Sequence, residues 1–100
     1  MTRQEAIELI NSGKVNAKVY GLSKRVNNVD VIDEIDAFEL DGMYYLVITK
    51  YEAAFKFIDH KLVELKNKVH ANFGFKEFSN KNQANAYFKK ASVGFTRYNA

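Results

Sequence analysis

The sequence predicts an α+β fold: an antiparallel three- to four-stranded sheet with packed helices, in the order α-β-β-β-α-β-α. Three observations predict it. A capped helical stripe opens the chain, an Asp-Gly pair separates two apolar runs, and a long apolar stripe at spacings of four and three follows. Because 100 residues is the size of one domain, residues 1–100 are expected to form a single globular domain.

The first element is expected to be a short helix over about residues 3–11. Thr2 and Glu5 have the spacing of a capping box, in which each satisfies a backbone amide of the other. Gly13 is free to adopt the left-handed conformation that ends a helix. The residues between them form one apolar stripe: Ala6, Ile7 and Ile10.

The segment KVNAKVYG, residues 14–21, has the period-two pattern of a half-buried strand. Val15, Ala17 and Val19 alternate with polar residues. The polar and basic segment SKRVNN, residues 23–28, is expected to form a loop.

Residues 29–49 are expected to form a β-hairpin. Ile32, Ile35 and Phe38 also have helical spacing, but Asp41-Gly42 decides for the hairpin, because this dipeptide supplies the positive φ angles of a two-residue type I′ turn. The register then pairs Leu40 with Met43, Phe38 with Tyr45, and Ala37 with Leu46.

Both faces of this hairpin are apolar, so both must be covered, or one must be offered to a partner. One face holds Phe38, Leu40, Met43, Tyr45 and Val47. The other holds Ile35, Ala37, Tyr44, Leu46 and Ile48.

The expected cover is a helix over residues 50–67. Thr49 and Glu52 have the spacing of a second capping box, and the apolar stripe behind them is the strongest helical pattern in the chain. It consists of Tyr51, Phe55, Ile58, Leu62, Leu65 and Val69.

A fourth strand is expected in VHANFGFKEF, residues 69–78, followed by a helix capped by Ser79. The stripe of that helix is Ala84, Tyr87, Phe88 and Ala91. The tail VGFTRYNA has no period.

The sequence offers little for catalysis. It has no Cys, which excludes thiolate metal sites and cysteine nucleophiles, and neither a glycine-rich phosphate loop nor a nucleophile elbow is present. The two histidines are His60 and His70, and on a helix His60 would point about 100° away from Asp59. We therefore expect no enzymatic activity, no metal and no cofactor.

The N-terminal segment MTRQEAIELINSG is amphipathic, contains acids and is not followed by a long apolar run. This pattern is unlike that of a signal or transit peptide, and nothing is long enough to span a membrane. We expect a soluble, cytoplasmic protein without a membrane partner.

Charge is distributed unevenly along the chain. Residues 1–49 carry five basic and eight acidic side chains, whereas residues 50–100 carry ten basic and four acidic ones. Such a polarised surface can steer a charged partner, although the two halves can also attract each other within the fold. The acidic candidates for contact with a protein partner are Asp30, Asp33, Glu34, Asp36, Glu39 and Asp41.

Aromatic and basic residues interleave after residue 43, where twelve of the fourteen aromatic residues lie. Exposed rings beside Lys or Arg suit single-stranded nucleic acid. Most rings fall at core-facing positions, however, among them Phe73, Phe75, Tyr87 and Phe88. The candidates for exposed contact with nucleic acid or a partner are Lys24, Arg25, Lys89, Lys90, Arg97 and Tyr98.

The segments ELINSGKVNAKVYG and DGMYYLVIT, the latter followed by KFI, resemble the small phage-encoded anti-CRISPR inhibitors of type II-A nucleases. Members of that family carry a short helix, three antiparallel strands with an Asp/Asn-Gly hairpin, and then helices. The similarity covers roughly the first sixty residues, in layout and at a handful of positions. Those positions are Ile10, Lys18, Gly21, Gly42 and Tyr45.

The resemblance implies a phage or mobile-element protein that binds and inhibits a host defence complex in the host cytoplasm. One member of the family is an acidic mimic of DNA that occupies the nuclease's site for its target duplex. The acids of residues 30–41 match this feature, whereas the net charge of +6 over residues 50–100 departs from it.

Three functions remain open. The first is a non-enzymatic inhibitor that docks on a host nuclease or nucleoprotein complex through a charged surface. The second is an accessory protein that binds nucleic acid through basic residues of the C-terminal half. The third is a structural domain of a larger assembly, which predicts self-association.

Overall fold

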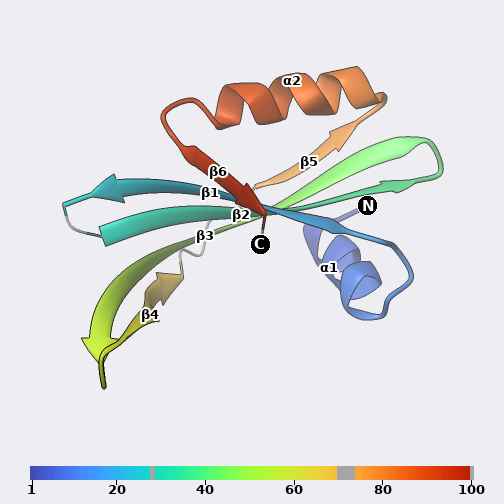
Figure 1. The fold of residues 1–100 in the computed structure, drawn as a ribbon. Helices are drawn as coiled ribbons and strands as arrows, with labels where there is room; N and C mark the ends of the chain where they lie inside the picture. The colour runs from blue at the N-terminus through green and yellow to red at the C-terminus, as the bar shows by residue number, and fades with distance from the viewer. Residues whose placement is uncertain (28, 70–73, 100) are drawn as a thin grey trace.

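A computed structural model describes residues 1–27, 29–69 and 74–99, with the backbone alone for 53–58, 62–69 and 97–99. Two helices and six strands are seen in this part of the chain (Figure 1). In chain order they are α1 (Arg3–Asn11), β1 (Lys18–Val26), β2 (Val29–Leu40), β3 (Met43–Ile58), β4 (Lys61–Val69), β5 (Phe75–Phe78), α2 (Lys81–Ala91) and β6 (Thr96–Asn99).

The strands form one antiparallel sheet in the order β4-β3-β2-β1-β6, and β5 pairs with β3 beside β4. The α+β class, with helices packed on an antiparallel sheet, is therefore confirmed. The sheet has more strands than the expected three to four, because β4 and β6 form where the sequence predicted a helix and an irregular tail.

The central hairpin has the predicted register. Phe38 pairs with Tyr45 and Leu40 with Met43. The turn residues Asp41 and Gly42 have φ angles of 51° and 80°, as a type I′ turn requires. The turn chemistry thus sets which side chains share a face.

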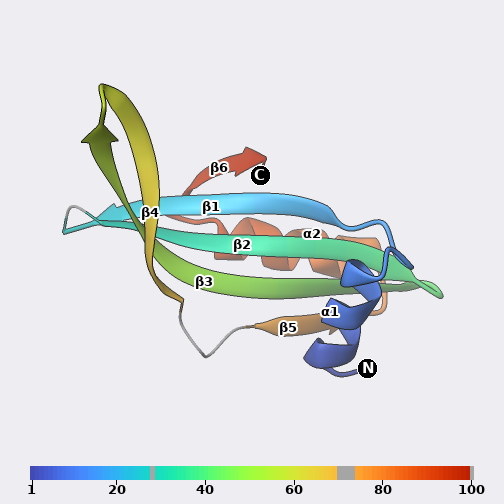
Figure 2. The same ribbon diagram turned by 90° about the horizontal axis from the view of Figure 1, so that it is seen from below.

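Both faces of the hairpin are covered, each by a different helix (Figures 1 and 2). On one face Phe38, Tyr45 and Val47 are buried with Ala6 of α1. On the other, the buried residues are Leu22, Ile35, Leu46 and Ile48, packed against Phe78, Tyr87 and Phe88. We call these the α1 face and the α2 face.

The predicted helix over residues 50–67 is wrong. β3 continues to Ile58, the chain turns at Asp59 and His60 with φ angles of 52° and 63°, and β4 returns from Lys61. A period-two pattern competed with the helical stripe. It consists of Val63, Leu65 and Val69 alternating with Glu64, Lys66 and Lys68. The covers of the hairpin are α1 and α2 instead.

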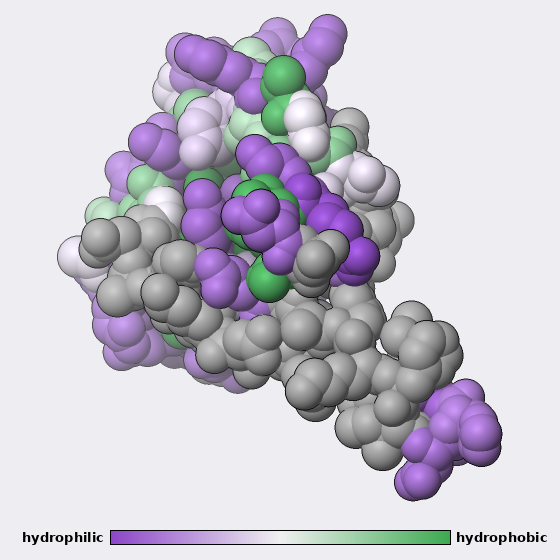
Figure 3. All heavy atoms as spheres, turned by 90° about the vertical axis from the view of Figure 1, so that its left-hand side faces the viewer, coloured by the Kyte–Doolittle hydropathy of each residue, from purple (hydrophilic) through white to green (hydrophobic). Residues whose placement is uncertain are grey.

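The end of the β3–β4 hairpin forms a two-stranded arm. Pairing of β2 with β3 ends at Asp30 and Ala53, so Ala54–Ile58 of β3 pair only with β4. A β-bulge between Glu52 and Ala53 adds twist here. The arm turns toward the side of the sheet that carries α1 (Figures 1 and 2), and its exposed hydrophilic tip, residues 59–61, stands away from the body (Figure 3).

The strand predicted at residues 14–21 begins later in the structure, and residues 23–26 of the predicted loop belong to that strand. β1 begins only at Lys18 and runs through Val26, because hydrogen bonds to β2 hold the polar SKR segment in the ladder. The strand contains Leu22, which is completely buried.

The C-terminal part differs in detail from the prediction. β5 covers only Phe75–Phe78 of the expected strand, and residues 70–73 lie outside the described part. Asn80, rather than Ser79, caps α2, and its side chain accepts a hydrogen bond from the amide of Gln83. The tail forms β6. Pairing with β1 stabilises this strand, although its sequence has no apolar periodicity.

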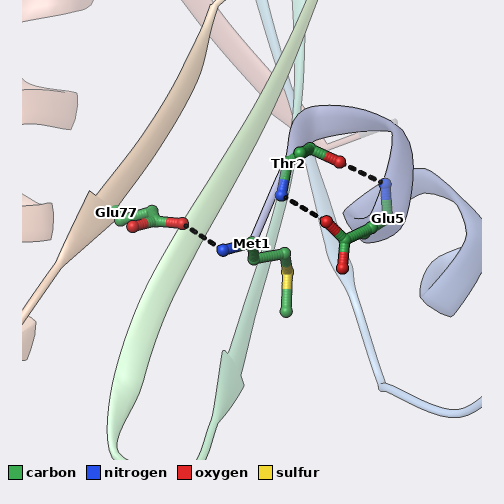
Figure 4. A network of polar contacts seen from close by, with 4 residues as sticks. All are labelled: Met1, Thr2, Glu5 and Glu77. Carbon is green, nitrogen blue, oxygen red and sulfur yellow. Dashed lines mark hydrogen bonds and ion pairs between the residues drawn. The ribbon is translucent and has the colours of Figure 1, made fainter.

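The N-terminal helix has the predicted capping box (Figure 4). The Thr2 hydroxyl accepts a hydrogen bond from the Glu5 amide, and the Glu5 carboxylate accepts one from the Thr2 amide, both at 3.1 Å. The N-terminal amine also lies 3.5 Å from a carboxylate oxygen of Glu77 in β5 (Figure 4). These contacts fix the start of α1 against the sheet.

Candidate partner-binding site

The acidic residues of β2 do not share one surface. Side chains alternate between the two faces along a strand, and cross-strand partners share a face. Because Phe38 belongs to the α1 face and Ile35 to the α2 face, alternation divides the acids between them. Asp30, Glu34 and Asp36 lie on the α1 face, Asp33 and Glu39 lie on the α2 face, and Asp41 lies in the turn.

Two of these acids are held by basic neighbours. Asp30 accepts a hydrogen bond from Nε of Arg25 at 3.1 Å, and Asp33 forms an ion pair with Lys50 at 3.7 Å. The side chains of both aspartates are only 14% exposed. Asp33 is largely shielded from solvent, because α2 packs on its side of the sheet.

Glu34 and Asp36 form an acidic pair on the α1 face. Both are half-buried, and within the described residues neither takes part in an ion pair. Burial raises the pKa of Asp36, and the neighbouring charge of Glu34 raises it further. The pair thus places two carboxyl groups close together on one face, with Asp36 partly buried.

The acidic pair lies between α1 and the arm. Glu34 stands opposite Thr49 of β3. From α1, the Arg3 guanidinium donates hydrogen bonds to the Ile48 carbonyl at 3.3 Å and to Oγ1 of Thr49 at 3.4 Å. The Arg3 guanidinium therefore lies beside this region, and the arm turns toward the same side of the sheet (Figure 2).

Replacing Asp36 by Asn should make the protein less sensitive to pH. A raised carboxyl pKa means that folding is favoured while the group is protonated, and that this contribution is lost as pH rises through the folded-state pKa. Asp36→Asn should therefore melt higher than wild type at pH 7, and the difference should shrink toward pH 3. Thermal melts of both proteins at the two pH values test this; a difference that is the same at both would contradict it.

The basic candidates are divided as well. Arg25 is occupied by Asp30, whereas the exposed Lys24 lies over the ring of Phe95 with Nζ 5.4 Å from its centroid. Lys89 and Lys90 are exposed in the last turn of α2, where their positive charges interact favourably with the helix dipole. Arg97 and Tyr98 pair in register with Leu22 and Gly21, and their side chains lie outside the described part.

The expectation that most aromatic rings serve packing is confirmed where their side chains are described. Phe75 packs against the α1 face, and Tyr87 and Phe88 pack against the α2 face. Phe73 lies outside the described residues.

A cavity of about 460 Å³ between the N-terminal half of α2 and the sheet is a feature that the sequence did not indicate. The cavity is lined by the rings of Tyr20, Tyr44 and Phe88 and also by Lys18 and Lys81. Only the packing of α2 on the sheet brings these residues together, so no local pattern could have revealed them.

In the described part of the chain, no group of three His, Cys, Asp or Glu side chains is arranged to hold a metal ion. His60 is an exposed turn residue rather than part of a helix, and His70 lies outside the described part. The described helices include none that is long and apolar enough to cross a membrane.

Comparison of the chain with models of protein families, with curated proteins and with solved structures finds no match.

Proposed function

We propose that this protein is a non-enzymatic inhibitor that docks on a host nuclease–nucleic-acid complex through the acidic pair of Glu34 and Asp36. The observation that carries the proposal is the placement of two neighbouring carboxylates on one face, neither of which forms an ion pair within the described residues. A positively charged groove that normally holds a nucleic-acid backbone is the complementary surface.

Because neither Glu34 nor Asp36 forms an ion pair within the described residues, their charges favour contact with a partner over pairing inside the fold. Asp30 and Asp33 show that the fold places Arg25 and Lys50 where it needs neutralisation. At Asp36 no ion pair within the described residues offsets the burial that raises the pKa of its carboxyl. A partly buried carboxylate with a raised pKa, such as Asp36, is a candidate for contact with a partner that supplies the opposite charge.

The layout that resembles type II-A inhibitors supports the choice of partner over the first half of the chain. The short helix, the three antiparallel strands and the Asp-Gly hairpin correspond to α1 and β1–β3. The correspondence ends after Thr49, because residues 50–69 form a β-hairpin rather than the helix expected from the resemblance.

Neutralising the acidic pair should abolish docking. The Glu34→Gln, Asp36→Asn double variant keeps the shape of both side chains and should bind a purified type II-A nuclease–guide RNA complex about tenfold or more weakly than wild type. Competition with a labelled target duplex measures this, and the advantage of wild type should shrink as salt is raised.

The matched control is Glu39→Gln, Asp41→Asn, which removes two exposed charges at the end of the same hairpin. It should bind like wild type. Equal binding by wild type and the Glu34→Gln, Asp36→Asn protein would remove the proposal. Retention of an oligonucleotide at low salt that is lost in Lys89→Gln, Lys90→Gln would support the nucleic-acid-binding alternative instead.

A further inference from the structure

The cavity under α2 is hollow because small side chains meet there. Ala37 of β2 and Ala84 of α2 both line it, and each contributes only a methyl group. Its volume of about 460 Å³ lies within the range of small-molecule sites. The large rings beside it belong to the packed core, so closing the space would require α2 to move.

Two kinds of aromatic surface bound this cavity. Tyr20 and Phe88 form a tilted pair with ring centroids 5.2 Å apart and an interplanar angle of 58°. Tyr44 lines it from β3, directly across the strand pair from Glu39 of β2. Burial and the charge of Glu39 raise the pKa of Tyr44, so the phenol stays neutral. Such walls accept a planar ring by stacking.

The charged groups at the cavity favour an anion. Lys18 of β1 and Lys81 of α2 are both exposed, and within the described residues neither forms an ion pair. Glu39 is the one carboxylate among the lining residues that are described, against two lysines. The balance of charge is therefore positive, with the two ammonium groups contributed by the sheet and by the helix.

We propose that this cavity binds a small aromatic anion, with its ring against Tyr20, Tyr44 and Phe88 and its acidic group between Lys18 and Lys81. A carboxylate, sulfonate or phosphate meets the same requirement. The site is independent of the proposed docking surface, because the two charge clusters lie on opposite faces of the sheet.

Fluorescence titration of the full chain with 8-anilinonaphthalene-1-sulfonate tests the proposal. Wild type should give saturable enhancement at one site. Lys18→Gln and Lys81→Gln should each weaken binding about threefold, the effect of one exposed ion pair. Asn85→Phe, which places a ring at a lining position, should abolish binding, whereas Asn82→Phe at a non-lining exposed position of the same helix should not.

Circular dichroism of each variant shows that it is folded, and amide shifts of Ala84 and Asn85 in wild type report the site directly. Titration with adenosine monophosphate and with indole-3-carboxylate then distinguishes a phosphate source from a carboxylate source by the larger shifts. Unchanged binding by folded Asn85→Phe, or no effect of either lysine substitution, would overturn the proposal. Absence of saturable enhancement and of shifts with all three probes would do the same.

Discussion

Leu22→Ala should lower the free energy of unfolding by about 3 kcal/mol, the cost of removing most of a large aliphatic side chain from a packed core. Leu22 is 0% exposed and lies on the α2 face with Ile35 and Leu46. Because two large clusters share this one hairpin, a void on either face should weaken the whole sheet. Urea denaturation followed by circular dichroism measures the effect.

Val26→Ala is the matched control for this substitution. Val26 ends the same strand but is 40% exposed, so its truncation should change stability by no more than about 0.5 kcal/mol. A similar loss in both variants would mean that Leu22 is not at the centre of the α2 face.

Gly42→Val should destabilise the protein by about 2 kcal/mol through backbone strain alone. Gly42 has a φ angle of 80°, which a β-branched residue adopts only at high cost, and a Cβ built there meets nothing within 4 Å. Gly42→Asn should cost much less, since Asn tolerates left-handed angles. Denaturation midpoints of the two variants test this. Equal losses would show that the turn is not held in the type I′ geometry.

The central hairpin was predictable because its strongest determinant is local. Asp41-Gly42 fixes a two-residue turn, and the turn fixes the register of Phe38 against Tyr45. The first helix was predictable for the same reason, since Thr2 and Glu5 cap it within its own first turn. In both cases neighbouring residues determine the geometry without help from the rest of the fold.

The segment after Thr49 was not predictable in the same way. Its apolar residues satisfy a helical stripe and a strand alternation at once, and only pairing with β2 on one side and β4 on the other selects the strand. Strand β6 likewise depends on partners far away in sequence, because Thr96–Asn99 become a strand by pairing with β1. Tertiary hydrogen bonds override local pattern in both places.

The candidate site was predictable in composition but not in arrangement. The sequence shows an acidic segment, and alternation along β2 could have divided it into two faces. It does not show that Arg25 and Lys50 neutralise Asp30 and Asp33, because those partners come from neighbouring strands. Glu34 and Asp36 emerge as the candidate pair only once these contacts are known.

Thiol footprinting tests the central claim, that the acidic α1 face is the docking surface, most directly. The chain has no Cys, so one substitution introduces a single reactive thiol at a chosen position. Ser23→Cys lies opposite Ile32, on the face of Glu34 and Asp36, and Asn82→Cys lies exposed on α2. When the nuclease–guide complex is added, labelling of Ser23→Cys should be blocked while Asn82→Cys still reacts. Protection of Asn82→Cys with free labelling of Ser23→Cys would contradict the account.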